Sequence, residues 1–157
     1  QLPEAQIDRF LVKTGIGYPD DDEEVELLRR RAGRTTRSPT VETVIDDGEL
    51  TELRQVPETI RVDDDLLAYI AAIARATRED HRVEVGVSPR GTQRLFEASR
   101  AMATLAGREF VSPDDVKRVA RAALAHRLVL TPDARVDGTD KRAIVEDVLG
   151  TVAVPTV

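Results

Sequence analysis

Apolar residues recur at helical spacing in three stretches of the chain, and this periodicity restricts the possible fold more than any other feature. Residues 66–74, 88–103 and 112–124 place aliphatic side chains three or four positions apart, as on the buried face of an α-helix. Two of these stretches open with Ser-Pro, a capping serine followed by proline at the first helical position, and Asp63 can cap the other. The pattern predicts an all-α fold, a bundle of closely packed helices.

Shorter elements are predicted on the N-terminal side of this bundle. The acidic run at 20–24 should open a helix that ends in arginines before Gly33, because both charge blocks suit the helix dipole. Residues 34–46 are rich in breakers and predict a mobile insertion, with a short strand or extended loop near its end. Asp47 is expected to cap a short helix that stops before Pro57.

On the C-terminal side, residues 127–130 are expected to form a short strand, and about 140–149 a final helix. Residues 151–157 should be a fraying C-terminal tail. Helices thus account for most of the predicted structure.

Composition narrows the class of protein. Aromatic residues are only 3% of the chain and tryptophan is absent, so the core must be aliphatic. The absence of cysteine excludes disulfides, cysteine zinc sites and thiol nucleophiles, and favours the cytoplasm as compartment. No signal peptide or membrane span is recognisable in the sequence, and a net charge of −6 gives no general attraction to nucleic acid or anionic lipid.

The charged residues are unevenly chosen. Lysine occurs only at 13, 117 and 141, every other cation is arginine, and acidic residues come in runs such as 20–24 and 63–65. This bias resembles the proteins of salt-loving archaea. A GC-rich genome would produce much of the same bias, so both origins stay open.

Four motifs carry a resemblance to the MoxR family of AAA+ ATPases. Residues 86–91 read Gly-Val-Ser-Pro-Arg-Gly, similar to the Gly-Ala-Ser-Pro-Arg-Ala that opens a lid helix of that family. Residues 107–116 resemble its Gly-Arg-Asp-Tyr-Val-x-Pro-x-Asp-Val stretch, and 126–128 its closing His-Arg-Leu. Residues 2–10 resemble the Leu-Pro-Glu-Ala-Gln-Leu-Asp-Arg-Phe segment that precedes the lid.

The resemblance implies roles for particular residues. Arg90 would be the sensor 2 arginine that reaches the terminal phosphate of ATP, with Pro89 and Gly91 beside it at the nucleotide. A helix N-terminus with an arginine in its first turn suits phosphate chemically. Arg9 would be the arginine finger directed at the ATP of a neighbouring subunit. The alternatives are an exposed Arg90 without a ligand, and an Arg9 that pairs with Asp8 or packs on the hinge; Gly91 in place of alanine suggests only local flexibility.

The same resemblance implies the rest of the assembly. The chain contains no Gly-x-x-x-x-Gly-Lys-[Ser/Thr] phosphate loop, so ATP and Mg²⁺ would be bound mainly by an absent core and this piece alone should be inactive. Residues 1–19 would end that core and form a hinge around 15–19, and 20–150 would be the helical lid. Expected partners are that core, neighbouring subunits of a hexamer and von Willebrand factor A-domain proteins, with a chaperone-like remodelling role.

Other features suggest weaker alternatives. His81 and His126 are too isolated to suggest a metal site, and no metal is expected on the acidic runs. A different class of function would be a stand-alone helical DNA-binding or protein-interaction module, with Lys117, Arg118 and Arg121 on the 112–126 helix. The acidic Asp114 and Asp115 at the start of that helix disfavour DNA.

Overall fold

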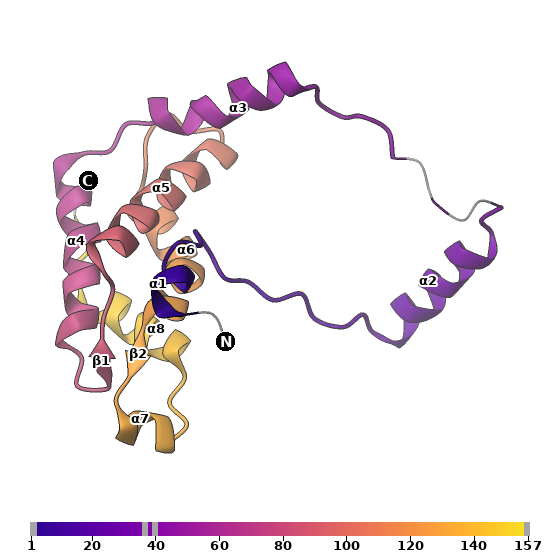
Figure 1. The fold of residues 1–157 in the computed structure, drawn as a ribbon. Helices are drawn as coiled ribbons and strands as arrows, with labels where there is room; N and C mark the ends of the chain where they lie inside the picture. The colour runs from indigo at the N-terminus through magenta and orange to yellow at the C-terminus, as the bar shows by residue number, and fades with distance from the viewer. Residues whose placement is uncertain (1–2, 36–37, 39–40, 156–157) are drawn as a thin grey trace.

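The computed structural model describes residues 3–35, 38 and 41–155 and is largely helical, as the apolar periodicity predicted (Figure 1). Its elements are α1 (Glu4–Ile7), α2 (Asp21–Ala32), α3 (Asp47–Thr59), α4 (Asp64–Glu79), β1 (Val83–Val85), α5 (Pro89–Leu105), α6 (Pro113–Leu124), the 3₁₀ helix η1 (Ala125–Arg127), β2 (Val129–Leu130), α7 (Pro132–Val136) and α8 (Lys141–Thr151). The predicted all-α class is confirmed, with short strands added to a helical bundle.

The core lies between α4, α5, α6 and α8 and is built from aliphatic side chains. Ile73, Leu95, Val116 and Ile144, one from each of these helices, are all 0% exposed. Small residues such as alanine fill the space between them, which allows the helices to approach closely.

The two strands form a small antiparallel sheet beside the bundle. Val83 pairs with Leu130 and Val85 with Val129, with an irregularity between the two pairs. The strand predicted at 127–130 is therefore present but confined to its last two residues, because Ala125–Arg127 continue α6 as a 3₁₀ turn. The sheet fixes the segment that leads from β1 into α5.

Most predicted helix ends are confirmed, and α3 is the main exception. Asp46, rather than Asp47, is its N-cap, and it exchanges hydrogen bonds of 2.8 Å with Glu49. The helix also continues through Pro57 to Thr59. Proline removes one backbone donor there, but the acceptor it would serve belongs to Leu53, which is 53% exposed and can be solvated by water.

Two expected details of burial and order are also corrected. Leu67 was expected on the buried face of α4, but it is 41% exposed, and Tyr69 is buried in its place. At the other end of the chain, α8 continues through Thr151, and Val152 packs against the core. The fraying expected from residue 151 is therefore not seen at its first residues, whereas 156–157 lie outside the described residues.

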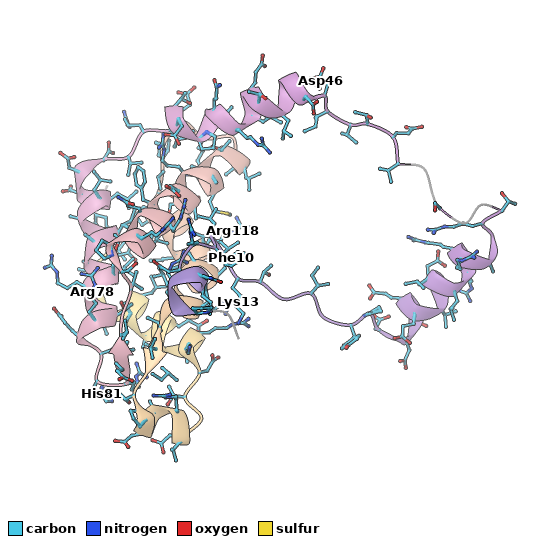
Figure 2. The ribbon with its side chains drawn as sticks, in the orientation of Figure 1. Phe10, Lys13, Asp46, Arg78, His81 and Arg118 are labelled. Atoms are coloured by element: carbon cyan, nitrogen blue, oxygen red, sulfur yellow. The ribbon has the colours of Figure 1, made fainter. Side chains whose placement is uncertain are left out.

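An arm that carries α2 stands away from the bundle (Figure 1). Residues 12–20 run outward without regular secondary structure, and Ile16 and Tyr18 are 99% exposed. α2 is capped by Asp20 and Glu23, yet it buries none of its residues. The expected 34–46 insertion forms the return path, and 36–37 and 39–40 within it lie outside the described residues; Asp46 marks its junction with α3 in Figure 2.

A search of residues 3–35, 38 and 41–155 finds no helix with the length and apolar content of a transmembrane span.

Candidate functional site

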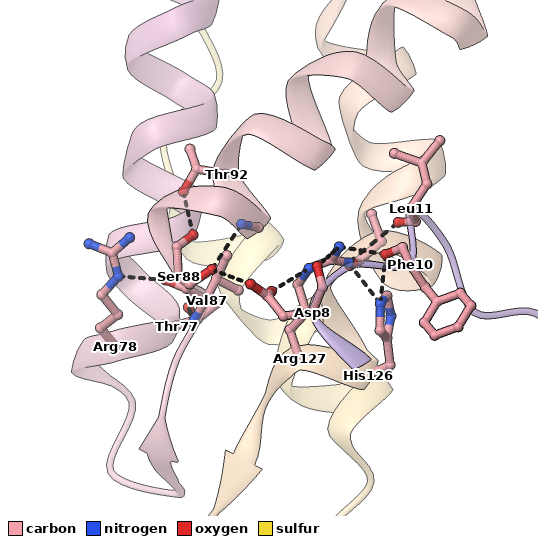
Figure 3. Close-up of polar contacts among 12 residues, drawn as sticks. Asp8, Phe10, Leu11, Thr77, Arg78, Val87, Ser88, Thr92, His126 and Arg127 are labelled. Carbon is pink, nitrogen blue, oxygen red and sulfur yellow. Dashed lines mark hydrogen bonds and ion pairs between the residues drawn. The ribbon is translucent and has the colours of Figure 1, made fainter. Parts of the chain in front are cut away.

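Three segments that are far apart in the sequence meet where α5 begins (Figure 3). They are the N-terminal residues 8–11, the β1–α5 connection at 86–91, and η1 with its flanks at 123–127. Three of the four motifs that carry the family resemblance are therefore brought together by the fold. The fourth, at 107–116, lies at the opposite end of α5, where Arg108 holds the Asp115 carboxylate with bonds of 2.7 and 2.5 Å.

The approach to α5 is held by the C-terminal half of α4. The Val87 N–H donates to the Thr77 hydroxyl at 3.0 Å, and the Arg78 Nε donates to the Val87 carbonyl at 2.7 Å. Gly86 lies so close to α4 that a Cβ there would be 2.8 Å from the Arg78 Cα. Only glycine avoids that overlap, so this residue fixes the direction in which the chain enters α5.

The first turn of α5 has the predicted cap. The Ser88 hydroxyl accepts a 3.0 Å hydrogen bond from the Gly91 N–H, and Pro89 occupies the first helical position. Arg90 follows and is exposed, with no hydrogen bond or ion pair to the described residues. Its guanidinium and the helix dipole therefore present positive charge to solvent at this helix end.

Asp8 joins the N-terminal segment to both other segments. One carboxylate oxygen accepts from the Ser88 hydroxyl at 3.0 Å, and the other accepts from the Arg127 Nε at 3.0 Å. We call these three residues, Asp8, Ser88 and Arg127, the joint. Its contacts span 80 and 119 positions of sequence, so they depend on the complete fold.

Arg127 is the buried member of the joint, with a side chain only 1% exposed. Besides Asp8, its guanidinium donates to the backbone carbonyls of Asp8, Phe10, Leu11 and Ala123. Burial lowers the pKa of this guanidinium, and the Asp8 carboxylate opposes that shift. Such a satisfied, buried cation holds the N-terminal segment against η1.

The structure corrects two expectations about this region. Asp8 does not pair with Arg9; the Arg9 side chain is exposed and makes no hydrogen bond or ion pair with the described residues. Gly91 is buried, and a Cβ there would lie 2.8 Å from both Arg127 Cδ and Val87 Cγ1. It therefore serves close packing of Arg127 against α5, in addition to any flexibility.

The chain is similar in sequence to known proteins. Residues 75–148 match the family model of the AAA lid domain. The chain is 39% identical to the uncharacterized protein YeaC of Bacillus subtilis and 36% identical to Chaperone MoxR1 of Mycobacterium tuberculosis, over 98% and 99% of its length. It spans 48% and 43% of those proteins, or about half the length of these curated relatives.

The fold comparison agrees with the sequence comparison. A crystal structure of a candidate ATPase from Cytophaga hutchinsonii superposes with a TM-score of 0.91 at 30% identity, covering 99% of this chain and 50% of that one. Residues 75–148 thus have the fold of an AAA lid domain, and the relatives that this chain resembles include a MoxR chaperone.

The main cleft of the lid domain lies beside the joint. It has a volume of about 1220 Å³ and is lined by residues that include Asp8, Ser88 and Arg127, but neither Arg9 nor Arg90 lines it. Both arginines therefore lie outside this cleft.

His126 packs against the joint and is expected to titrate abnormally. Arg127 Nη1 lies 2.8 Å from His126 Nε2, and the Phe10 carbonyl oxygen lies 3.3 Å from the same nitrogen. Burial, and then the Arg127 charge, lower the pKa of this imidazole.

The pH dependence of stability should report this imidazole. Between its lowered folded pKa and the ordinary value of about 6.5, the unfolded chain binds the proton more readily, so the free energy of unfolding should fall as pH drops through that window. His126→Gln, whose amide oxygen can accept from Arg127, should flatten this slope in urea titrations. His81→Asn is the matched control, because the His81 side chain is 89% exposed at the α4–β1 turn (Figure 2); an equal flattening there would contradict the assignment.

The remaining sequence candidates have structural explanations. Asp20 and Glu23 cap α2, and Asp63 is the N-cap of α4. Among the residues that the structure describes, no group of three or more His, Asp or Glu side chains is placed to hold a metal ion. On α6, Arg121 forms a 2.7 Å ion pair with Glu146, while Arg118 is exposed (Figure 2).

Proposed function

We propose that this lid domain completes the nucleotide site of an ATP-hydrolysing AAA+ protein with a chaperone-like remodelling role. Arg90 would contact the terminal phosphate of ATP bound by the same subunit, and Arg9 would reach ATP bound by a neighbouring subunit. The observation that carries the proposal is Arg90 itself, an exposed cation in the first turn of a helix whose start is held in place by α4.

The residues at the start of α5 fit a phosphate group. Pro89 has no N–H, so the Arg90 N–H and guanidinium are the donors of this turn that Ser88 does not use. A guanidinium can hold two phosphate oxygens at once and stays charged at every relevant pH. Gly91 would let the turn stay close to Arg127 beneath it. Mg²⁺ and the phosphate loop would belong to the other half of the protein.

The arm supports a partner for the lid within the same protein. A TM-score of 0.91 over 99% of the chain supports a similar place for the arm in the Cytophaga hutchinsonii structure, although α2 buries no residue within this chain. We infer that the apolar side chains of Val25 and Leu28 pack against the ATPase core in the parent protein. Residues 1–19 would then be the end of that core and the hinge, 20–150 the lid and 151–157 the tail.

Further parts of the assembly are proposals from the family resemblance. The parent protein would form a hexamer in the cytoplasm, where Arg9 lies at the subunit interface, and would act with von Willebrand factor A-domain proteins. The acidic runs and the scarcity of lysine support a salt-rich cytoplasm, such as that of a haloarchaeon.

Replacing Arg90 tests the proposal. In the full-length protein, Arg90→Ala should lower kcat for ATP hydrolysis about 100-fold, because a positioned donor to developing charge contributes on that order. Arg90→Lys should recover only part of the loss, since an ammonium cannot bind two oxygens in one plane. Arg118→Ala, an exposed arginine on α6, is the control. Turnover that Arg90→Ala leaves unchanged would disprove the sensor role.

A further inference from the structure

The joint connects the two arginines that the proposed function assigns to different nucleotides. Asp8 directly precedes Arg9, and Ser88 lies two residues before Arg90. The Asp8 carboxylate and the Ser88 hydroxyl share a 3.0 Å hydrogen bond. Arg9 is therefore one residue away from this bond along the chain, and Arg90 is two residues away. The backbones that carry Arg9 and Arg90 cannot separate while this bond and its supports hold.

Further hydrogen bonds hold the N-terminal segment in place beside the joint. Arg127 binds the Asp8 carboxylate and also the carbonyls of Asp8 and Phe10, so it grips the backbone on both sides of Arg9. Three residues after Phe10, the Lys13 N–H donates to the Ala122 carbonyl at 2.9 Å. The exposed Arg9 side chain, by contrast, makes no bond to the described residues. The segment is thus fixed by its backbone while its arginine remains available.

Burial of Arg127 favours the intact joint. The Arg127 side chain is 1% exposed and the Asp8 side chain 24%. Separation would leave the buried guanidinium without its carboxylate, which is unfavourable. The intact joint therefore resists separation of the two segments.

We propose that Asp8 and Arg127 are positioning residues that make Arg9 and the start of α5 move as one rigid body. The proposal rests on the function assigned above to Arg9 and Arg90. When ATP draws Arg90 toward its phosphate, the joint carries Arg9 with it and so changes the geometry of the finger in the neighbouring site. Asp8 and Arg127 need not touch nucleotide.

A distance measurement tests the joint independently of catalysis. The chain has no cysteine, so spin labels can be attached to cysteines introduced at the exposed Gln6 and Gln93 of the full-length protein. We expect one narrow distance distribution, and a clearly broadened one in Asp8→Ala at unchanged helical content. Asp8→Asn, which keeps an acceptor for Arg127 and a polar group for Ser88, should stay near the parent. Glu52→Ala, an exposed carboxylate on α3, is the control. An unchanged distribution in Asp8→Ala overturns the proposal.

A double-mutant cycle tests whether the joint acts through Arg9. Asp8→Ala should lower kcat about 10-fold, with KM for ATP changed less than about twofold, because misplacement affects the reacting geometry more than ground-state binding. In the Arg9→Ala background, the same substitution should have little further effect on kcat. If Asp8→Ala lowers kcat by the same factor with and without Arg9, Asp8 has a merely structural role. That result would overturn the proposed coupling between the joint and Arg9. Failure of the proposed function would appear separately, as unchanged turnover in Arg9→Ala and Arg90→Ala themselves.

Discussion

Arg9→Ala in the full-length protein is expected to lower kcat for ATP hydrolysis about 1000-fold, the order of effect that an arginine finger has in phosphoryl transfer. The guanidinium would neutralise charge that develops on the transferred phosphoryl group, and water cannot replace a fixed cation there. The Arg9 side chain is exposed and makes no bond to the described residues, so its loss should leave the fold intact. Turnover at saturating ATP, with circular dichroism as a check on folding, measures the effect.

Mixing experiments distinguish action across a subunit interface from action within one subunit. Rings assembled from Arg9→Ala and Arg90→Ala subunits should regain part of the lost activity. Some interfaces then combine an intact Arg90 in one subunit with an intact Arg9 from the next. No recovery, despite confirmed mixing, would place both arginines at the same subunit's nucleotide. Arg75→Ala, an exposed arginine on α4, should match the parent protein throughout.

Arg127→Met is expected to destabilise the protein by about 3–5 kcal/mol, the cost of removing one partner from a buried ion pair. Methionine fills much of the same volume, but the carbonyls of Asp8 and Phe10 lose their donor and the Asp8 carboxylate loses its cation. The midpoint of urea unfolding, followed by the helical signal, measures the change. The N-terminal segment should separate from η1 first.

The control for Arg127 is the neighbouring Arg121. Its side chain is 59% exposed and its partner Glu146 is 57% exposed, so Arg121→Met should cost less than about 1 kcal/mol. If the two substitutions destabilise the protein equally, burial does not make the Arg127 ion pair more important for stability than the exposed one.

The local signals of the sequence were sufficient for most of the helical architecture. Ser88 and Ser112 mark the starts of α5 and α6 because cap and proline chemistry act within one turn of backbone. The errors also lie at local ambiguities. Asp46 and Asp47 are both capping residues, and the choice depended on Glu49 three residues beyond Asp46. Pro57 was read as a stop although an exposed helix can tolerate it.

The residue types of the candidate site could be predicted, but their arrangement could not. Arg90 and Arg9 were identified by resemblance, and their roles at ATP stay predictions. Asp8 and Arg127 lie inside the same motifs, yet their partners were missed. A single sequence gives no sign of a contact across 119 positions, and the adjacent Arg9 offered Asp8 a simpler local pair. The signal that could have found the joint is that Asp8 and Arg127 each match a residue of the family motif in which they lie.

By itself, the sequence determined where helices begin, which faces are apolar and that a cation follows the cap of α5, because these depend on neighbours within a few residues. Only the tertiary structure decided that Asp8 meets Ser88 and Arg127, and that Gly91 must be small. Those outcomes depend on how α4, α5 and η1 pack. Because Arg127 is buried, it can bind only the groups that the fold places beside it.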